Sequence, residues 1–208
     1  MTYKRSLPRR SAAVLAAGAA VLVLANCGGG GGDGDGPVGH GGHRTTASPS
    51  ASPGRPNAAD VAFASGMIPH HRQAVEMAGL APGRARSAEV RRLAAEIEKA
   101  QAPEIRTLSG WLTSWGEEVP AEGAMDHSAH GMGGMMTDEE MSGLAHASGT
   151  AFDTAFLTMM IEHHRGAVAM ARTERADGAY APATGLAEEI ITSQSAEIER
   201  MNRLLGED

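Results

Sequence analysis

The sequence MIPHHRQAVEMA, residues 67–78, decides the fold of this 208-residue chain because it occurs twice. Residues 160–171 read MIEHHRGAVAMA, at an offset of 93 positions. The residues repeated at this offset are Asp60, Phe63, Met67, Ile68, His70, His71, Arg72, Ala74, Val75, Met77 and Ala78. The offset continues through Leu93, Ala94, Glu96, Ile97, Gln101, Glu104 and Ile105, which recur as Leu186, Ala187, Glu189, Ile190, Gln194, Glu197 and Ile198. Such a repeat indicates an internal duplication.

Apolar residues recur at helical spacing throughout both copies, and aromatic residues make up only 3% of the chain. We therefore predict four helices, at residues 58–80, 86–116, 138–175 and 183–206, with breaks at Gly- and Pro-rich segments. Two helical hairpins from a duplication predict an all-α four-helix bundle. The bundle domain would span 57–207, with repeats at about 60–115 and 153–208 and a connecting loop at 117–137.

The N-terminus has the pattern of an export leader. Four basic residues in MTYKRSLPRR precede the apolar run SAAVLAAGAAVLVLA, and LANC then ends at the only cysteine, Cys27. We predict a signal peptide at 1–27 with a lipobox-like end and acylation of Cys27. Ordinary signal cleavage is the alternative, since Asn26 departs from the lipobox pattern. Residues 28–56 are rich in Gly, Ser and Pro and predict a disordered tether, so we expect a lipoprotein on the outer face of the cell membrane.

Charge and cysteine content limit the functions. Removing the leader takes away four of 18 basic residues and none of 25 acidic ones, which leaves a formal charge of −11. Such an acidic chain disfavours nucleic acid and tolerates cations. With no further cysteine, soft-metal chemistry would depend on methionine and histidine.

The helical arc that carries the repeated histidines is otherwise apolar. At 100° per residue, His70 and His71 share this arc with Met67 and Met77, and the second copy does the same with Met160, His163, His164 and Met170. The following helices place Gln101, Glu104, Gln194 and Glu197 in their apolar stripes. Buried carboxylates and amides need partners. We expect these four to support the histidines by hydrogen bonds or around a shared metal, although a purely structural network is the alternative. Adjacent histidines diverge by 100°, so we expect at most one of each pair to point straight inward and the other to pair with a Glu or face a groove.

The connecting loop is the most specific metal signal. Its candidate ligands are Met125, His127, His130, Met132, Met135 and Met136, with Met141 following. Thioether and imidazole together suit Cu(I) or Ag(I). His40 and His43 form a second imidazole cluster in the tether. A solvated low-complexity loop is the alternative interpretation.

The doubled HHR motif, followed in each copy by Q..EI, resembles the domain of unknown function 305 family over about Asp60 to Leu205. The resemblance implies a ferritin-like four-helix bundle of an exported bacterial protein, with links to copper in some members. The motif positions are Met67, His70, His71 and Met77, with Met160, His163, His164 and Met170. Pro69 of the first copy is replaced by Glu162 in the second, so the two halves need not be equivalent.

Two functions follow from these patterns. The first is membrane-tethered Cu(I) or Ag(I) sequestration or delivery through Met and His ligands, with copper as the cofactor. The alternative is a surface lipoprotein whose bundle binds another protein and whose histidines are structural. We do not expect an enzyme, because the chain has no Glu-x-x-His motif of di-iron bundles and no Ser- or Cys-based nucleophile motif.

Overall fold

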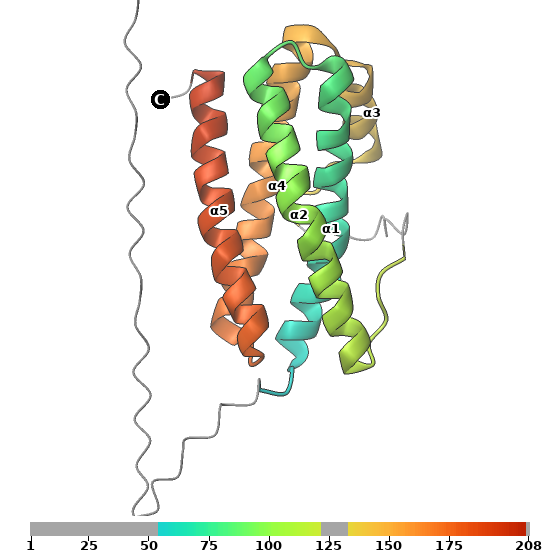
Figure 1. Ribbon diagram of the computed structural model, residues 1–208, viewed down its shortest axis with the longest axis vertical. Coiled ribbons are helices and arrows are strands. Elements are labelled where there is room, and N and C mark those ends of the chain that lie inside the picture. The colour runs from blue at the N-terminus through green and yellow to red at the C-terminus, as the bar shows by residue number, and fades with distance from the viewer. Residues whose placement is uncertain (1–53, 122–132, 207–208) are drawn as a thin grey trace, which may run out of the picture. The chain divides into compact units, whose positions relative to one another are not determined.

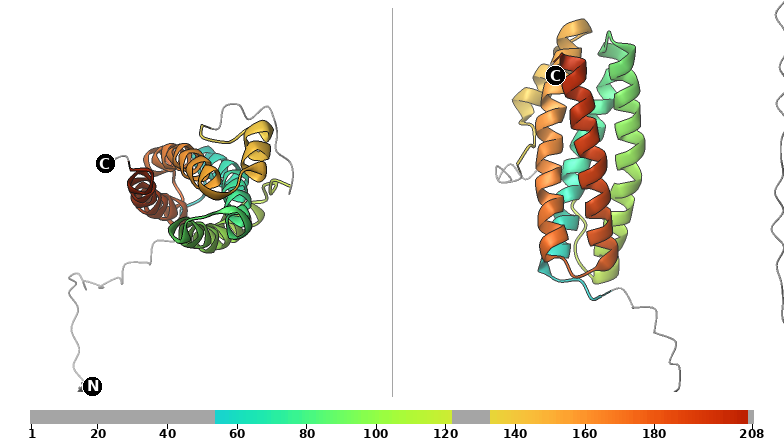
Figure 2. Two further views of the ribbon diagram at one scale, coloured as in Figure 1. Left: turned by 90° about the horizontal axis from the view of Figure 1, so that it is seen from above. Right: turned by 90° about the vertical axis from the view of Figure 1, so that its left-hand side faces the viewer.

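Residues 54–121 and 133–206 are described by the computed structural model, and they form five helices (Figure 1). These are α1 (Ala58–Arg84), α2 (Ala88–Trp115), α3 (Asp138–His146), α4 (Gly149–Asp177) and α5 (Ala181–Leu205). The hairpins α1–α2 and α4–α5 pack together mainly through α1 and α4 (Figure 2). The predicted all-α four-helix bundle is confirmed. Within the described residues, no helix is long and apolar enough to cross a membrane.

The predicted helix at 138–175 is wrong, because the chain breaks there into α3 and α4. Ser148 is extended, and Gly149 adopts a φ of +64° that an L-residue avoids. A single bridge joins Gly149 to Ala85, at the end of α1. The short α3 is turned back against α1 and α4, where Met141 and Leu144 are buried. Met141 is therefore a packing residue.

Side-chain caps fix where the helices begin. Asn57 and Asp60 form a capping box at the start of α1, and Thr137 and Glu140 form another at α3. Ser87 accepts from two backbone amides at the start of α2. These caps place α1 and α2 within a few residues of the predicted starts. The end of α1 lies four residues beyond the prediction, because Pro82 and Gly83 are accommodated in its last turns.

Two apolar clusters fill the bundle. One joins residues 74–81 of α1 to residues 152–161 of α4 and includes Met77, Leu93, Ile97, Phe156 and Met160. The other joins residues 63–68 of α1 to residues 167–171 of α4 and includes Phe63, Met67, Leu108, Leu112 and Ile190. Residues 70–73 and 163–164 lie between the clusters in both long helices. The polar centre of the bundle therefore interrupts its hydrophobic core midway.

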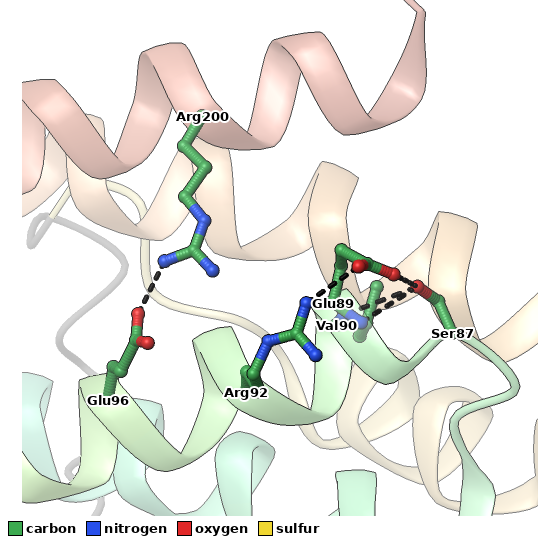
Figure 3. A network of polar contacts seen from close by, with 6 residues as sticks. All are labelled: Ser87, Glu89, Val90, Arg92, Glu96 and Arg200. Carbon is green, nitrogen blue, oxygen red and sulfur yellow. Dashed lines mark hydrogen bonds and ion pairs between the residues drawn. The ribbon is translucent and has the colours of Figure 1, made fainter. Parts of the chain in front are cut away.

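An ion pair links α2 to α5 at the surface, beside a second pair within α2 (Figure 3). Arg200 of α5 pairs with Glu96 of α2, and Arg92 pairs with Glu89, its neighbour one turn away, at 2.6 Å. Exposed ion pairs of this kind contribute little to stability, about 0–1 kcal/mol each. The hairpins therefore need other contacts to hold them together.

Two repeated aspartates supply such contacts. Asp60 of α1 accepts from the amides of Ala179 (3.2 Å) and Tyr180 (2.9 Å) in the α4–α5 turn. Asp153 of α4 accepts in the same way from Arg86 (3.1 Å) and Ser87 (2.9 Å) in the α1–α2 turn. The two contacts are equivalent, because each aspartate and each turn residue of one contact lies 93 positions from its counterpart in the other. Each hairpin thus fixes the turn of the other.

Replacing Asp153 by alanine should lower the free energy of unfolding by about 2 kcal/mol. The change removes two hydrogen bonds to a carboxylate that is only 9% exposed and leaves two turn amides without that acceptor. Urea denaturation followed by circular dichroism measures the loss. The exposed Glu162→Ala variant is the control, with an expected change below about 0.5 kcal/mol. A loss no larger than that of the control would show that Asp153 does not hold the turn.

Candidate functional site

Two His–Glu pairs lie at equivalent positions of the two repeats. His71 Nε2–H donates to Glu104 Oε2 at 2.6 Å, and His164 Nε2–H donates to Glu197 Oε2 at 2.7 Å. Both histidine side chains are fully buried, whereas the glutamates are about a quarter exposed, at 23% and 22%. One histidine of each pair therefore bonds to a glutamate, as the sequence indicated. Each pair joins the two helices of one hairpin.

The other two histidines meet each other. The ring centroids of His70 and His163 are 3.8 Å apart, with their planes tilted by 44°. They are repeats of one position, so their contact lies on the pseudo-twofold axis that relates the hairpins. Both are buried, at 0% and 1% exposure, and their ring nitrogens have no hydrogen-bond partner among the described residues. All four histidines are buried, and in each adjacent pair one meets a glutamate while the other lies at the centre of the bundle.

Burial keeps the central imidazoles neutral. It lowers the pKa of His70 to about 3, and the neighbouring His71 and His164 add to the effect. Burial likewise lowers the pKa of His163 well below 6.5, with His70 the next largest cause. Both rings are then uncharged at pH 7, and a neutral imidazole has a lone pair for a metal. Buried polar atoms left without partners are rare and call for an explanation.

The methionines of the repeated motif differ in burial between the two copies. Met67 and Met160 are fully buried one helical turn before His70 and His163, on the same helix faces. Met77 is also fully buried, whereas its counterpart Met170 is partly exposed. Met67 and Met160 are therefore the fully buried methionines that lie one turn from a central histidine on each helix.

The predicted glutamines follow the same symmetry. Gln101 and Gln194 are each 3% exposed, and the Oε1 atom of each has no hydrogen-bond partner among the described residues. Together with Glu104 and Glu197 they form the predicted polar stripe on α2 and α5. In the part of the chain that the structure describes, the glutamates bond to histidine and the glutamines do not.

The end of the Met- and His-rich loop reaches this region. Met135 and Met136 are partly buried, and Met136 packs against the apolar cluster that contains Met160. The remaining candidates of the loop and the N-terminal segment lie outside the described residues: Met125, His127, His130, Met132, His40, His43 and Cys27. The signal peptide and nearly all of the predicted tether lie outside them as well.

Carboxylate ligands are scarce near the central pair. Within residues 54–121 and 133–206, no three His, Cys, Asp or Glu side chains come close enough together to hold a metal ion. A metal at His70 and His163 would therefore draw further ligands from methionine sulfur. Such a donor set fits the soft ions Cu(I) and Ag(I) and disfavours the hard ions that need several carboxylates.

Sequence reasoning missed the positions where the repeats differ. Gln73 is fully buried, and its counterpart is Gly166. Glu174 is buried at 1% exposure, and its counterpart is Ala81. A comparison of the repeats could have found them, because at each of these positions one copy has a polar residue where the other has a small buried one.

The fold and this interior define a class of protein, the duplicated four-helix bundle with a histidine-rich centre. The sequence model of the DUF305 family, a domain of unknown function, matches residues 60–205, and the chain belongs to this family. Among curated proteins none matches the chain.

Solved structures agree with this assignment. A DUF305 protein from Streptomyces coelicolor, classed as secreted, is 39% identical with a TM-score of 0.65, over 72% of this chain and 93% of that one. A DUF305 fragment from Deinococcus radiodurans is 30% identical with a TM-score of 0.66, over 74% and 99%. CopM in its Cu(I)-bound form is 33% identical with a TM-score of 0.59, over 70% and 94%. CopM has also been solved with Cu(II) and with silver.

Proposed function

We propose that this chain binds Cu(I) or Ag(I) outside the cytoplasm and sequesters or delivers it. The observation that carries the proposal is the contact between His70 and His163, two neutral buried imidazoles whose nitrogens have no partner among the described residues. Met67 and Met160 supply soft sulfur one turn away on each helix. The copper- and silver-bound forms of CopM support this choice of metal.

A second, more exchangeable site in the connecting loop is part of the proposal. Its ligands would be Met125, His127, His130, Met132, Met135 and Met136. The leader, the tether and acylation of Cys27 would place the protein on the outer face of the membrane, and the secreted S. coelicolor relative supports export. Metal ions and the membrane are then its partners, with no role for nucleic acid and no catalysis.

A Cu(I) competition titration against a chromogenic chelator tests the proposal. The chain without its leader is compared with a His70→Leu/His163→Leu variant and with a variant that lacks residues 125–136. We expect the leucine variant to bind Cu(I) in the bundle at least tenfold more weakly, because leucine keeps the volume of histidine but offers no lone pair. The exposed His146→Ala variant is the control and should bind like the natural chain.

The remaining outcomes separate the alternatives. Binding lost only with residues 125–136 would place the site in the loop and make the bundle a scaffold. No competition by the natural chain would contradict the proposal and favour structural histidines in a protein-interaction module.

A further inference from the structure

The segment Gly133–Met136 crosses the bundle at the level of the histidines. It leads from the connecting loop to α3 and lies against both central helices, α1 and α4. Two contacts hold it there, one on each helix. The contact residues are Gln73 of α1 and Gly166 of α4, which are the same position of the two repeats.

Gln73 binds the segment through its side-chain amide. Its Nε2–H donates to the carbonyl of Met136 at 2.8 Å, and its Oε1 accepts from the amide of Met136 at 2.7 Å. The glutamine side chain is fully buried, so this pairing satisfies polar groups that are costly to leave without partners. The second repeat cannot offer the same contact, because glycine has no side chain.

Gly166 gives the segment room. A Cβ atom at Gly166 would lie 1.7 Å from the carbonyl oxygen of Gly133, so the two backbones are in direct contact. Gly134 has a φ of +89°, and a Cβ there would lie 2.5 Å from the carbonyl of Glu162. Neither glycine can be replaced without moving the segment. One repeated position has thus become a hydrogen-bonding glutamine on α1 and a glycine on α4 that allows close backbone contact. We call Gln73 and Gly166 together the seat of the segment.

The seat is aligned with the central pair. Gln73 lies one turn after His70, and Gly166 lies one turn after His163, so each contact shares a helix face with a central histidine.

We propose that Gly133–Met136 is a strap that closes the route to the His70–His163 pair and controls how fast a ligand enters and leaves it. The strap follows from the contacts of Gln73 and Gly166 alone. Its control of metal exchange rests, in addition, on the proposed function. A short segment of this kind, with two side-chain hydrogen bonds to Gln73, can open locally while the bundle stays folded.

Chemical labelling of the metal-free chain tests the strap without any metal. Diethyl pyrocarbonate modifies accessible neutral imidazoles, and mass spectrometry of peptides gives the rate at each histidine. Gly166→Ala displaces the strap by steric clash, and Gln73→Leu removes its two hydrogen bonds. In both variants we expect His70 and His163 to be labelled at least tenfold faster than in the natural chain.

The controls separate opening of the strap from unfolding. The exposed His146 should react at the same rate in every chain. Gly79→Ala adds a methyl group on α1 where nothing lies within 4 Å, and it should leave all labelling rates unchanged. Circular dichroism shows whether the helices are retained. Labelling of His70 and His163 at the natural rate in both folded strap variants would overturn the strap.

Metal release gives the second measurement. From the Cu(I)-loaded chain, both strap variants should lose the metal to excess chelator at least tenfold faster than the natural chain. Equal release rates would overturn the control of metal exchange. If the natural chain binds no Cu(I), the proposed function fails, while the labelling experiment still decides whether the strap covers the histidines.

Discussion

At pH 4.5, a metal-free chain with His70 and His163 both replaced by leucine should be more stable than the natural chain by up to about 5 kcal/mol. Burial lowers the pKa of His70 to about 3 and that of His163 well below 6.5, while each titrates near 6.5 in the unfolded chain. Below pH 6.5 the unfolded chain therefore binds two protons that the folded chain excludes. Each excluded proton lowers the free energy of unfolding by about 1.4 kcal/mol per pH unit.

The sign of this effect distinguishes a metal site from a structural network. At pH 7 the leucine variant should be at least as stable as the natural chain, because the imidazole nitrogens have no partners among the described residues and leucine is of similar size. Urea denaturation at pH 7 and pH 4.5, in the presence of a chelator, measures both differences. His146→Leu is the matched exposed control, with an expected change below about 0.5 kcal/mol. Destabilisation of the leucine variant at both pH values would show that the histidines hold the bundle together.

The Glu174→Gln variant should gain about 3 kcal/mol of stability over the natural chain at pH 7. Burial raises the pKa of Glu174 from 4.5 to about 8, and the neighbouring Asp60 raises it further. Between pH 4.5 and 8 the unfolded chain loses this proton while the folded chain keeps it. Stability therefore falls as the pH rises through this range, by about 1.4 kcal/mol per unit, and glutamine removes the loss.

Asp60 remains the charged member of this carboxyl pair. Burial opposes its ionisation, but hydrogen bonds from the backbone of Asn57, Tyr180 and Ala179, together with Glu174, outweigh burial and lower its pKa. Denaturation at pH 5 and pH 7 measures the effect of Glu174→Gln, and the gain should shrink to below about 1 kcal/mol at pH 5. A variant less stable than the natural chain at pH 7 would mean that the folded protein needs the ionised carboxylate. Glu174→Ala, which copies Ala81 of the other repeat, tests whether the position needs a polar group at all.

The repeat made most of the bundle predictable. A constant offset identified two hairpins, and helical spacing placed the four histidines and the Gln and Glu residues of the following helices in one interior. Which histidine pairs with which glutamate came only from the structure. The break at Ser148 and Gly149 was missed because helix-forming residues lie on both sides and no proline marks it. The docking of α3 against α1 and α4, which accompanies the break, depends on distant parts of the chain.

The candidate site was predictable only where the repeats agree. The contact between His70 and His163 was missed, because the directions of side chains on one helix do not reveal which side chain of a second helix they meet. Glu174 and Asp60 are neighbours in the fold but lie 114 positions apart in the sequence. Neither helical spacing nor the repeat offset links them. Gln73 and Gly166 were missed because the comparison rested on identical positions, whereas these two matter by being different.

The reciprocal contacts of Asp60 and Asp153 have an evolutionary consequence. A lone hairpin of this kind carries an aspartate whose partner turn belongs to a second hairpin, so a single-hairpin ancestor would complete both contacts only as a twofold symmetric dimer. In such a dimer both copies have the same residue at every position. Glutamine could therefore not stand at the equivalent of position 73 in one copy while glycine stood there in the other. Joining the two copies in one chain removed that constraint, and each half became free to acquire a different task.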